Sequence, residues 1–225
     1  LVPQRGFDWL TLPLGSGKAV RRACGCTLND LVLATVAGAV RAFLIRRHVR
    51  PDGCGFHVTV PVGVEPSIRR RQLGPRVSSW RLRLPVGEPD ARQRLARIQD
   101  VTAELERSRH ALPVEAILGE AQWTPSRLIS LGARAVSDRA HMVVTNVPGP
   151  RHPLHLLGAR LLAMHAQTSL AAGTGLAIAV VSTHDQLCWG FNADYELLPD
   201  LAAFRDGVAA AFHELALAAG VDPSD

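Results

Sequence analysis

A long apolar segment between Thr27 and Arg47 constrains the fold most, because its apolar side chains recur at the spacing of a helix. Thr27 is a favourable N-cap residue, and Asp30 stands three positions later, as in a capping box. We therefore predict a helix over residues 27–47. Arg41 interrupts the run, so no stretch reaches the roughly 18 unbroken apolar residues of a membrane-spanning helix, and we do not expect a transmembrane protein.

The rest of the chain mixes apolar runs of strand length with amphipathic helices. The predicted strands span residues 56–62, 77–84, 142–147, 155–165, 175–182 and 187–193. The further predicted helices span residues 88–108, 114–122, 125–137 and 201–219, with a short apolar segment at 7–14 and a brief helix from 15 toward 24. Polar residues at 183–186 predict a hairpin between the last two strands. This order predicts the α/β or α+β class, with a mixed β-sheet flanked by helices.

The net charge of +5 does not indicate a nucleic-acid partner. Lys18 is the only lysine among 25 basic residues, and the arginines are scattered among acidic residues along most predicted helices. The one cluster is Arg69-Arg70-Arg71, which we interpret as a solvated loop in preference to a contact for a polyanion or an anionic lipid. We therefore expect no nucleic-acid partner.

The spacing of cysteine and histidine indicates neither a disulfide framework nor a metal site. The four cysteines form no C-x-x-C pair, and the lone histidines lack the spacing of zinc ligands. The pair Gly17-Lys18 lacks the earlier glycine of a phosphate-binding loop. With no secretory signal visible in the first residues, we expect a cytoplasmic protein without a bound metal.

One short motif, His48-Val49-Arg50-Pro51-Asp52-Gly53, contains the residue types of a general base and its support. In CoA-dependent acyltransferases of the chloramphenicol acetyltransferase type, an H-x-x-x-D-G motif supplies a histidine that takes the proton of an alcohol. There the motif follows a strand and leads into a helix, whereas His48 follows a predicted helix and precedes a strand. Because Pro51 and Gly53 are typical of a turn, we favour a turn over catalysis for His48 and Asp52.

Two further segments are harder to explain by folding alone. In the first, the capping box accounts for Asp30 but not for the neighbouring Asn29. The second, Thr145-Asn146-Val147-Pro148-Gly149-Pro150, places an amide and a rigid exit at the end of an apolar strand. The Asn146 side chain either satisfies backbone groups or faces a ligand.

As a set, these segments resemble the C-terminal half of bacterial wax ester synthase/diacylglycerol acyltransferases. The resemblance rests on the runs TLNDLVLATVAGAVRAFL, VTVPVGV, LGPRVSSWRLRLPVGEPDARQRLARI, VVTNVPGP, GLAIAVVSTHDQLCWGFNAD and LLPD, in the same order and spacing from about Phe7 to Ala218. It implies one half of a chloramphenicol acetyltransferase-like two-lobed fold, with a tunnel between the lobes. Residues 1–26 are then a linker and lead-in segment, and residues 27–225 are the acyltransferase C-terminal domain.

The same resemblance implies an acyl-CoA-dependent O-acyltransferase that acts on fatty alcohol or diacylglycerol, with acyl-CoA as co-substrate and no tightly bound cofactor. Its partner would be an N-terminal half that this sequence does not include, and contact with a membrane or lipid droplet would be peripheral. Because the family's catalytic histidine lies in that half, the isolated chain is expected to be inactive. The implied active-site wall consists of Asn29, Asp30, Thr145, Asn146, Pro148 and Gly149.

The function of the chain and the role of Asp30 stay open at this point. The chain is either half of such an enzyme or a non-catalytic half-fold that binds lipid or docks a partner. A condensation-type domain fits the N-D helix and N-V-P-G-P less well. For Asp30, a capping role is favoured over a catalytic one. Pro75 stands where the family usually has asparagine, so the amide donor and acceptor of that loop is lost.

Overall fold

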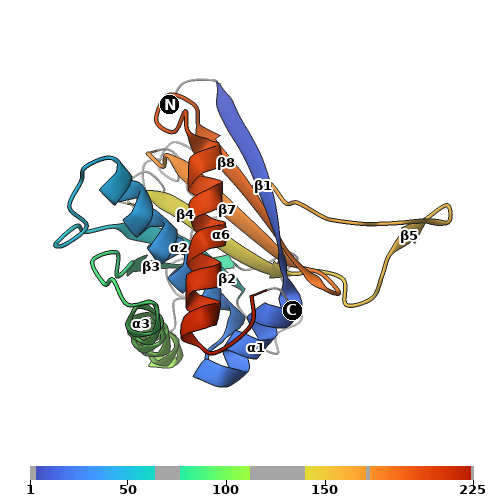
Figure 1. The fold of residues 1–225 in the computed structure, drawn as a ribbon, viewed down its shortest axis with the longest axis horizontal. Helices are drawn as coiled ribbons and strands as arrows, with labels where there is room; N and C mark the ends of the chain where they lie inside the picture. The colour runs from blue at the N-terminus through green and yellow to red at the C-terminus, as the bar shows by residue number, and fades with distance from the viewer. Residues whose placement is uncertain (1–3, 64–76, 112–139, 171–172, 224–225) are drawn as a thin grey trace, which may run out of the picture.

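The computed structural model describes residues 4–63, 77–111, 140–170 and 173–223 (Figure 1). Its elements are β1 (Arg5–Pro13), α1 (Leu14–Cys24), α2 (Leu28–Arg46), β2 (His57–Gly63), β3 (Val77–Arg83), α3 (Ala91–Ala111), β4 (Met142–Pro148), β5 (His155–Leu156), β6 (Ala159–Arg160), β7 (Leu176–Ser182), β8 (Gln186–Asp194) and α6 (Leu201–Ala218). The predicted helices at 114–122 and 125–137, the arginine cluster at 69–71 and Pro75 lie outside the described residues.

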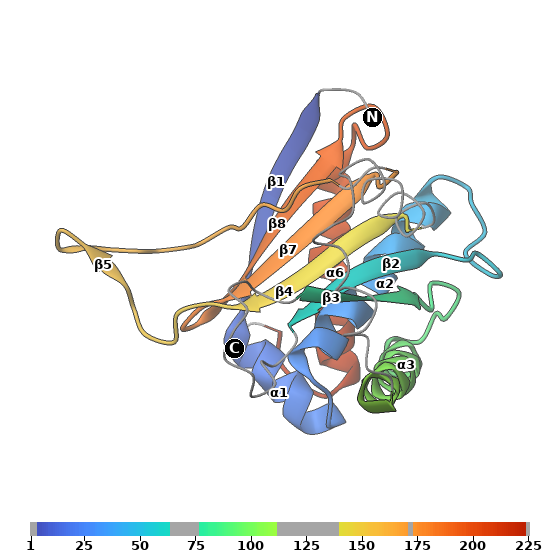
Figure 2. The ribbon, with the colours of Figure 1, turned by 180° about the vertical axis from the view of Figure 1, so that it is seen from behind.

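Six strands form one sheet in the order β1-β8-β7-β4-β2-β3. The central β7, β4 and β2 run parallel, whereas β3 is antiparallel to β2, and β8 is antiparallel to both β7 and β1. Figures 1 and 2 show α2 and α6 across one face of this sheet, with α1 and α3 beside them. The prediction of a mixed sheet flanked by helices is confirmed, and so is the hairpin between β7 and β8.

The helix predicted from residue 27 is α2, and it lies at the centre of the core. Every residue from Asp30 to Val40 is buried, because α2 packs against α3 and α6 as well as against the sheet. By length and composition, α2 is also long and apolar enough to cross a membrane, with a mean hydropathy of 1.6. Since 61% of that stretch is buried inside the protein, these properties are those of a core helix.

The first strand, β1, forms one edge of the sheet. β1 pairs with β8 along its whole length of nine residues, from Arg5 opposite Asp194 to Pro13 opposite Gln186. On the helix side, Asp8 accepts hydrogen bonds of 2.9 and 3.1 Å from the Arg205 guanidinium of α6. Residues 5–24, expected to belong to a linker and lead-in segment, thus form a strand and a helix that pack with the rest. The domain boundary at residue 27 stays a prediction.

The strand predicted for residues 155–165 is wrong. Instead, β5 and β6 form a hairpin of two residues per strand, at the tip of an arm (residues 150–162) that projects from the sheet (Figures 1 and 2). Leu157 and Gly158 turn the chain with φ of 50° and 85°. The apolar residues of this segment imitate a buried strand, but Leu156 is 77% exposed and Leu157 fully so.

Three helices approach one another closely at Gly38 of α2. A Cβ atom at position 38 would lie 2.9 Å from the Ala211 Cβ of α6 and 2.9 Å from the Arg94 Nη2 of α3. The Arg94 side chain is buried, and its guanidinium donates to the Glu88 carbonyl at 3.1 Å and to the Glu214 carboxylate at 2.6 Å. The missing side chain at residue 38 therefore leaves room for an arginine to pass between α2 and α6.

We predict opposite effects for two glycine-to-alanine changes at this helix contact. Gly38→Ala is expected to lower the free energy of unfolding by about 1–3 kcal/mol, because the new methyl group overlaps Ala211 and Arg94. Gly207→Ala on α6 meets nothing closer than 4.0 Å and should raise it by up to about 1 kcal/mol through helix propensity. Urea unfolding of the two variants checks this. Equal stabilities would contradict the close packing at Gly38.

Candidate functional site

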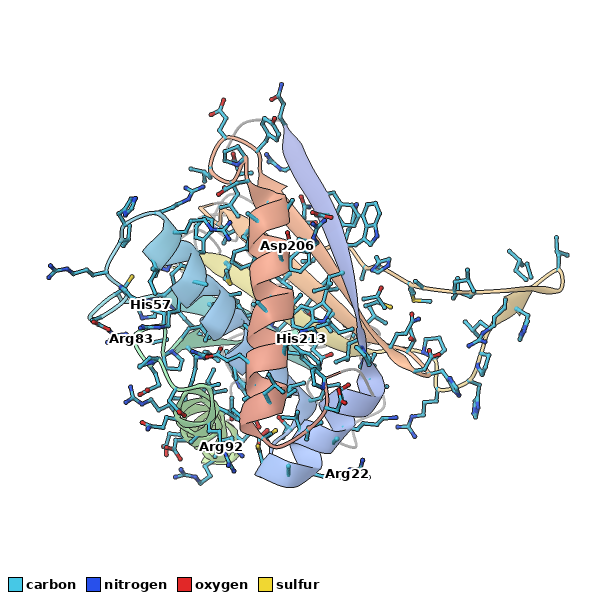
Figure 3. All side chains as sticks on the ribbon, in the orientation of Figure 1. Arg22, His57, Arg83, Arg92, Asp206 and His213 are labelled. Atoms are coloured by element: carbon cyan, nitrogen blue, oxygen red, sulfur yellow. The ribbon has the colours of Figure 1, made fainter. Side chains whose placement is uncertain are left out.

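The Asn29-Asp30 pair at the start of α2 and the segment 145–150 at the end of β4 lie at the same end of the sheet. The parallel strands β2 and β4 end there, and α2 begins there, close to α1 (Figure 2). In Figure 3, Arg22 of α1 marks this end, and His57 at the start of β2 marks the other. Carboxyl ends of parallel strands and helix N-termini both present backbone polar groups, which is why ligands of α/β proteins commonly bind at such ends.

Asp30 is fully engaged in holding the first turn of α2. Its carboxylate accepts from the Thr27 backbone N–H at 2.9 Å, and its own N–H donates to Thr27 Oγ1 at 3.1 Å. Its other oxygen, Oδ1, accepts a 2.7 Å hydrogen bond from the hydroxyl of Thr102 on α3. With both oxygens occupied, Asp30 has the geometry of a cap. The adjacent Asn29 is half-buried and takes no part in this network.

At the end of β4, an amide oxygen without a partner among the described residues is followed by a tightly packed glycine. Asn146 Oδ1 is buried and has no hydrogen-bond partner among the described residues. Asn146 shares its face of the strand with the core residue Val144, whereas Thr145 is half-buried on the opposite face. At Gly149, a Cβ atom would lie 2.7 Å from Val181 Cγ1, so only glycine fits. Pro148 before it is exposed.

The two residues weighed as a general base and its support lie elsewhere. His48 and Asp52 are exposed in the connection between α2 and β2, at the opposite end from Asn146. His48 has a left-handed φ of 57°. Asp52 is 4.0 Å from the Arg41 guanidinium. The motif thus follows a helix and leads into a strand, which is the geometry of a turn.

Two features of the described residues could not be found from the sequence. Thr102 contacts Asp30 from 72 positions away, and a lone threonine in an amphipathic helix carries no signal of such a contact. His141 stacks on Phe56 with a centroid distance of 4.7 Å and accepts from the His57 N–H at 3.0 Å. With Phe56 it lines an apolar hollow of about 270 Å³. A second hollow of about 540 Å³ lies beside Arg83 and α3, and neither contains Asn29 or Asn146.

Comparison with known protein families identifies the family of this chain. The family described as the WS/DGAT C-terminal domain matches residues 73–216, which is more than half of the chain. The chain belongs to the WS/DGAT C-terminal domain family. The name stands for wax ester synthase/diacylglycerol acyltransferase, so the resemblance drawn from the sequence runs is confirmed.

Relatives of known sequence and structure agree with the family. "Probable diacylglycerol O-acyltransferase tgs1" of Mycobacterium tuberculosis H37Rv is 29% identical over 91% of this chain and 45% of its own length. The wax ester synthase/diacylglycerol acyltransferase of Marinobacter aquaeolei VT8 has 27% identity and a TM-score of 0.75, over 97% of this chain and 50% of that one. A condensation domain of the CDA synthetase shares the fold alone, at 18% identity, a TM-score of 0.56, and coverage of 98% of this chain and 46% of that one. The chain thus spans about half the length of these WS/DGAT relatives.

A buried thiol stands immediately before the WS/DGAT capping box. Cys26 is 7% exposed, and burial raises its pKa from the ordinary 9.0 to about 11, with the nearby Cys24 and Asp30 acting in the same direction. A cysteine nucleophile needs a lowered pKa, because the thiolate is the reactive form. Cys26 therefore stays protonated at neutral pH and acts as a core residue.

This raised pKa predicts a pH dependence of stability. Between about pH 9 and pH 11 the folded state retains a proton that the unfolded state has released, so stability is complete below this window and falls as the pH rises through it. The loss should approach about 1.4 kcal/mol per pH unit at most. Urea unfolding of the native chain and of Cys26→Ala across this window measures the difference. Parallel pH profiles would contradict the raised pKa.

Proposed function

We propose that this chain is the C-terminal half of an acyl-CoA-dependent O-acyltransferase that makes wax esters or triacylglycerol from fatty alcohol or diacylglycerol. Membership of the WS/DGAT C-terminal domain family carries the proposal. The names of the mycobacterial and Marinobacter relatives support this activity, and their doubled length supports a second half. Acyl-CoA is the proposed co-substrate, and contact with a membrane or lipid inclusion is proposed to be peripheral.

Exposed apolar side chains support an N-terminal half as the partner. On the edge strand β1, Trp9 is 55% exposed on the sheet face away from α6, and its ring centroid lies 6.0 Å from that of Phe7 and 6.2 Å from that of His165. On the arm, Leu156, Leu157 and Leu162 are exposed. Large apolar side chains gathered on projecting elements are typical of a surface that another polypeptide covers. We infer that the N-terminal half packs against β1 and the arm.

The proposed chemistry divides between the two halves. A histidine of the N-terminal half would take the proton of the alcohol while the alcohol oxygen attacks the thioester carbonyl. The C–S bond then breaks, and CoA leaves as a thiolate that takes the proton back from the histidine. On this chain, the start of α2 has backbone N–H groups without helical partners, and Asn29 adds an amide. These groups are suited to stabilising a carbonyl oxygen that gains charge. Asn146 Oδ1 is buried and has no partner among the described residues, so it is suited to accept from a hydroxyl, or from a donor of the other half, that reaches it when the two halves assemble.

A second candidate is a non-catalytic half-fold that binds lipid. The apolar hollow of about 270 Å³ beside Phe56 and His141 favours it, because aliphatic chains bind in such hollows. The two candidates differ in one observable. Only the enzyme half restores acyl transfer to an N-terminal half.

Acyl transfer from a long-chain acyl-CoA to a fatty alcohol or diacylglycerol tests the proposal. The chain alone is expected to give no product, and turnover should appear when the N-terminal half is added. His48→Ala should retain this turnover, because His48 lies in an exposed turn. Asn29→Ala and Asn146→Leu should each lower it by about tenfold or more. Activity of the isolated chain that is lost in His48→Ala would overturn the proposal.

A stability measurement separates function from folding at Asn146. Leucine has a similar size and removes an acceptor that no described residue satisfies, so the melting temperature of Asn146→Leu should be unchanged or higher. Lost turnover together with a lower melting temperature would indicate a structural role for the amide instead.

We further predict that the arm contributes to binding of the N-terminal half. Replacing both Leu156 and Leu157 by serine should raise the dissociation constant of the two halves by about tenfold or more, since burial of each leucine contributes about 1.5–3 kcal/mol. Both side chains are exposed, so folding of this chain should not change. The matched control is Leu217→Ser, an exposed leucine on α6. Titration calorimetry measures the affinity of the N-terminal half for the native chain, the double serine variant and the control. Equal affinities for all three proteins would exclude the arm from the contact.

A further inference from the structure

Thr102 connects α3 to the first turn of α2 through a buried hydrogen bond. Its hydroxyl donates to Asp30 Oδ1 at 2.7 Å, a charged acceptor that lies closer than the Ile98 and Gln99 carbonyls of α3 at 3.0 and 3.2 Å. Thr102 and Asp30 are only 6% and 4% exposed. A hydroxyl that donates to a carboxylate forms one of the stronger hydrogen bonds in proteins, more so where water is excluded. The capping box itself needs only Thr27 and Asp30. The bond from Thr102 is therefore not needed for the cap, and it joins the first turn of α2 to α3.

A second hydrogen bond from α3 holds the chain just before the first turn of α2. One helical turn before Thr102, the Gln99 side chain donates to the Gly25 carbonyl at 3.2 Å. Gly25 ends α1 with a left-handed φ of 62°. Gln99 and Thr102 thus hold the connection from α1 to α2 on both sides of Thr27. Asn29 lies between Thr27 and Asp30, so its position depends on these contacts.

We propose that Thr102 is a positioning residue, which fixes the first turn of α2 and with it Asn29 at the end of the sheet where acyl transfer takes place. The proposal rests on the proposed function of the chain. Without the hydroxyl, Asp30 Oδ1 loses its donor in a buried place, and the carboxylate turns toward water or toward other donors. The first turn of α2 then shifts with its cap. Misplacement of a catalytic group by about 1 Å can lower a rate about a hundredfold.

Thr102→Val and Thr102→Ser test the proposal, and Thr35→Val is the matched control. Valine keeps the shape of threonine and removes the hydroxyl, whereas serine keeps the hydroxyl. Thr35 is also buried, and its hydroxyl donates at 2.9 Å to the Leu31 carbonyl of its own helix. Thr35→Val therefore loses a buried hydroxyl that makes no contact with Asp30. All variants are compared with the native protein as the complete enzyme, formed with the N-terminal half.

The first measurement is turnover at a temperature well below all melting temperatures. Thr102→Val should lower kcat by about tenfold or more, while Thr102→Ser and Thr35→Val stay within about twofold of the native enzyme. Equal kcat values for Thr102→Val and Thr35→Val would overturn the proposal, because Thr102 would then contribute to stability alone.

The second measurement is amide hydrogen exchange on this chain, which needs no activity. The N–H groups of Thr27 and Asp30 bond within the capping box, so both should exchange about tenfold faster or more in Thr102→Val and at the native rate in Thr35→Val, after correction for global stability. Unchanged exchange in Thr102→Val would overturn the positioning role. If the complete native enzyme transfers no acyl group, the proposed function fails with the catalytic part of this inference, and exchange alone decides whether Thr102 holds α2.

Discussion

Burial of α2 is the constraint on which the rest of the structure depends. A helix that is apolar on nearly all sides needs cover from several directions, and here the sheet, α3 and α6 provide it. Close approach is possible because Gly38 leaves room for Arg94. The polar groups at the start of α2 cannot all reach water, so Thr27, Asp30 and Thr102 satisfy one another. Packing and polar satisfaction thus fix the same helix at its middle and at its end.

Local patterns predicted much of this fold, and contacts between distant segments explain what they missed. The limits of α2 followed from Thr27 and its apolar spacing, and the β7–β8 hairpin from four polar residues between apolar runs. The arm could not be separated from a strand, because exposed leucines such as Leu157 have the same composition as buried ones. The sequence shows residues 7–14 only as a short apolar segment, because β8, the partner strand of β1, lies near the other end of the sequence.

In the candidate site, too, local patterns could be predicted from the sequence, whereas contacts between distant segments could not. Capping chemistry is local, so the role of Asp30 could be inferred, but its bond to Thr102 depends on how α3 packs. That Asn146 Oδ1 finds no partner in the described part of the chain is a property of the folded environment, which the sequence does not show. His48 and Asp52 show the converse: residue letters that match a catalytic motif have no catalytic geometry when a helix precedes them and a strand follows. Whether a motif is catalytic depends on the helices and strands that flank it as much as on its residue types.

The pairing of β1 with β8 has a consequence for synthesis of the protein. Pro13 lies opposite Gln186, so residues 14–185 must emerge from the ribosome before this edge of the sheet can close. Until then β1 presents unpaired backbone groups along one whole strand, a template on which another nascent chain could pair. Chaperone contact during translation would be most useful in this interval, which ends when β8 has been made.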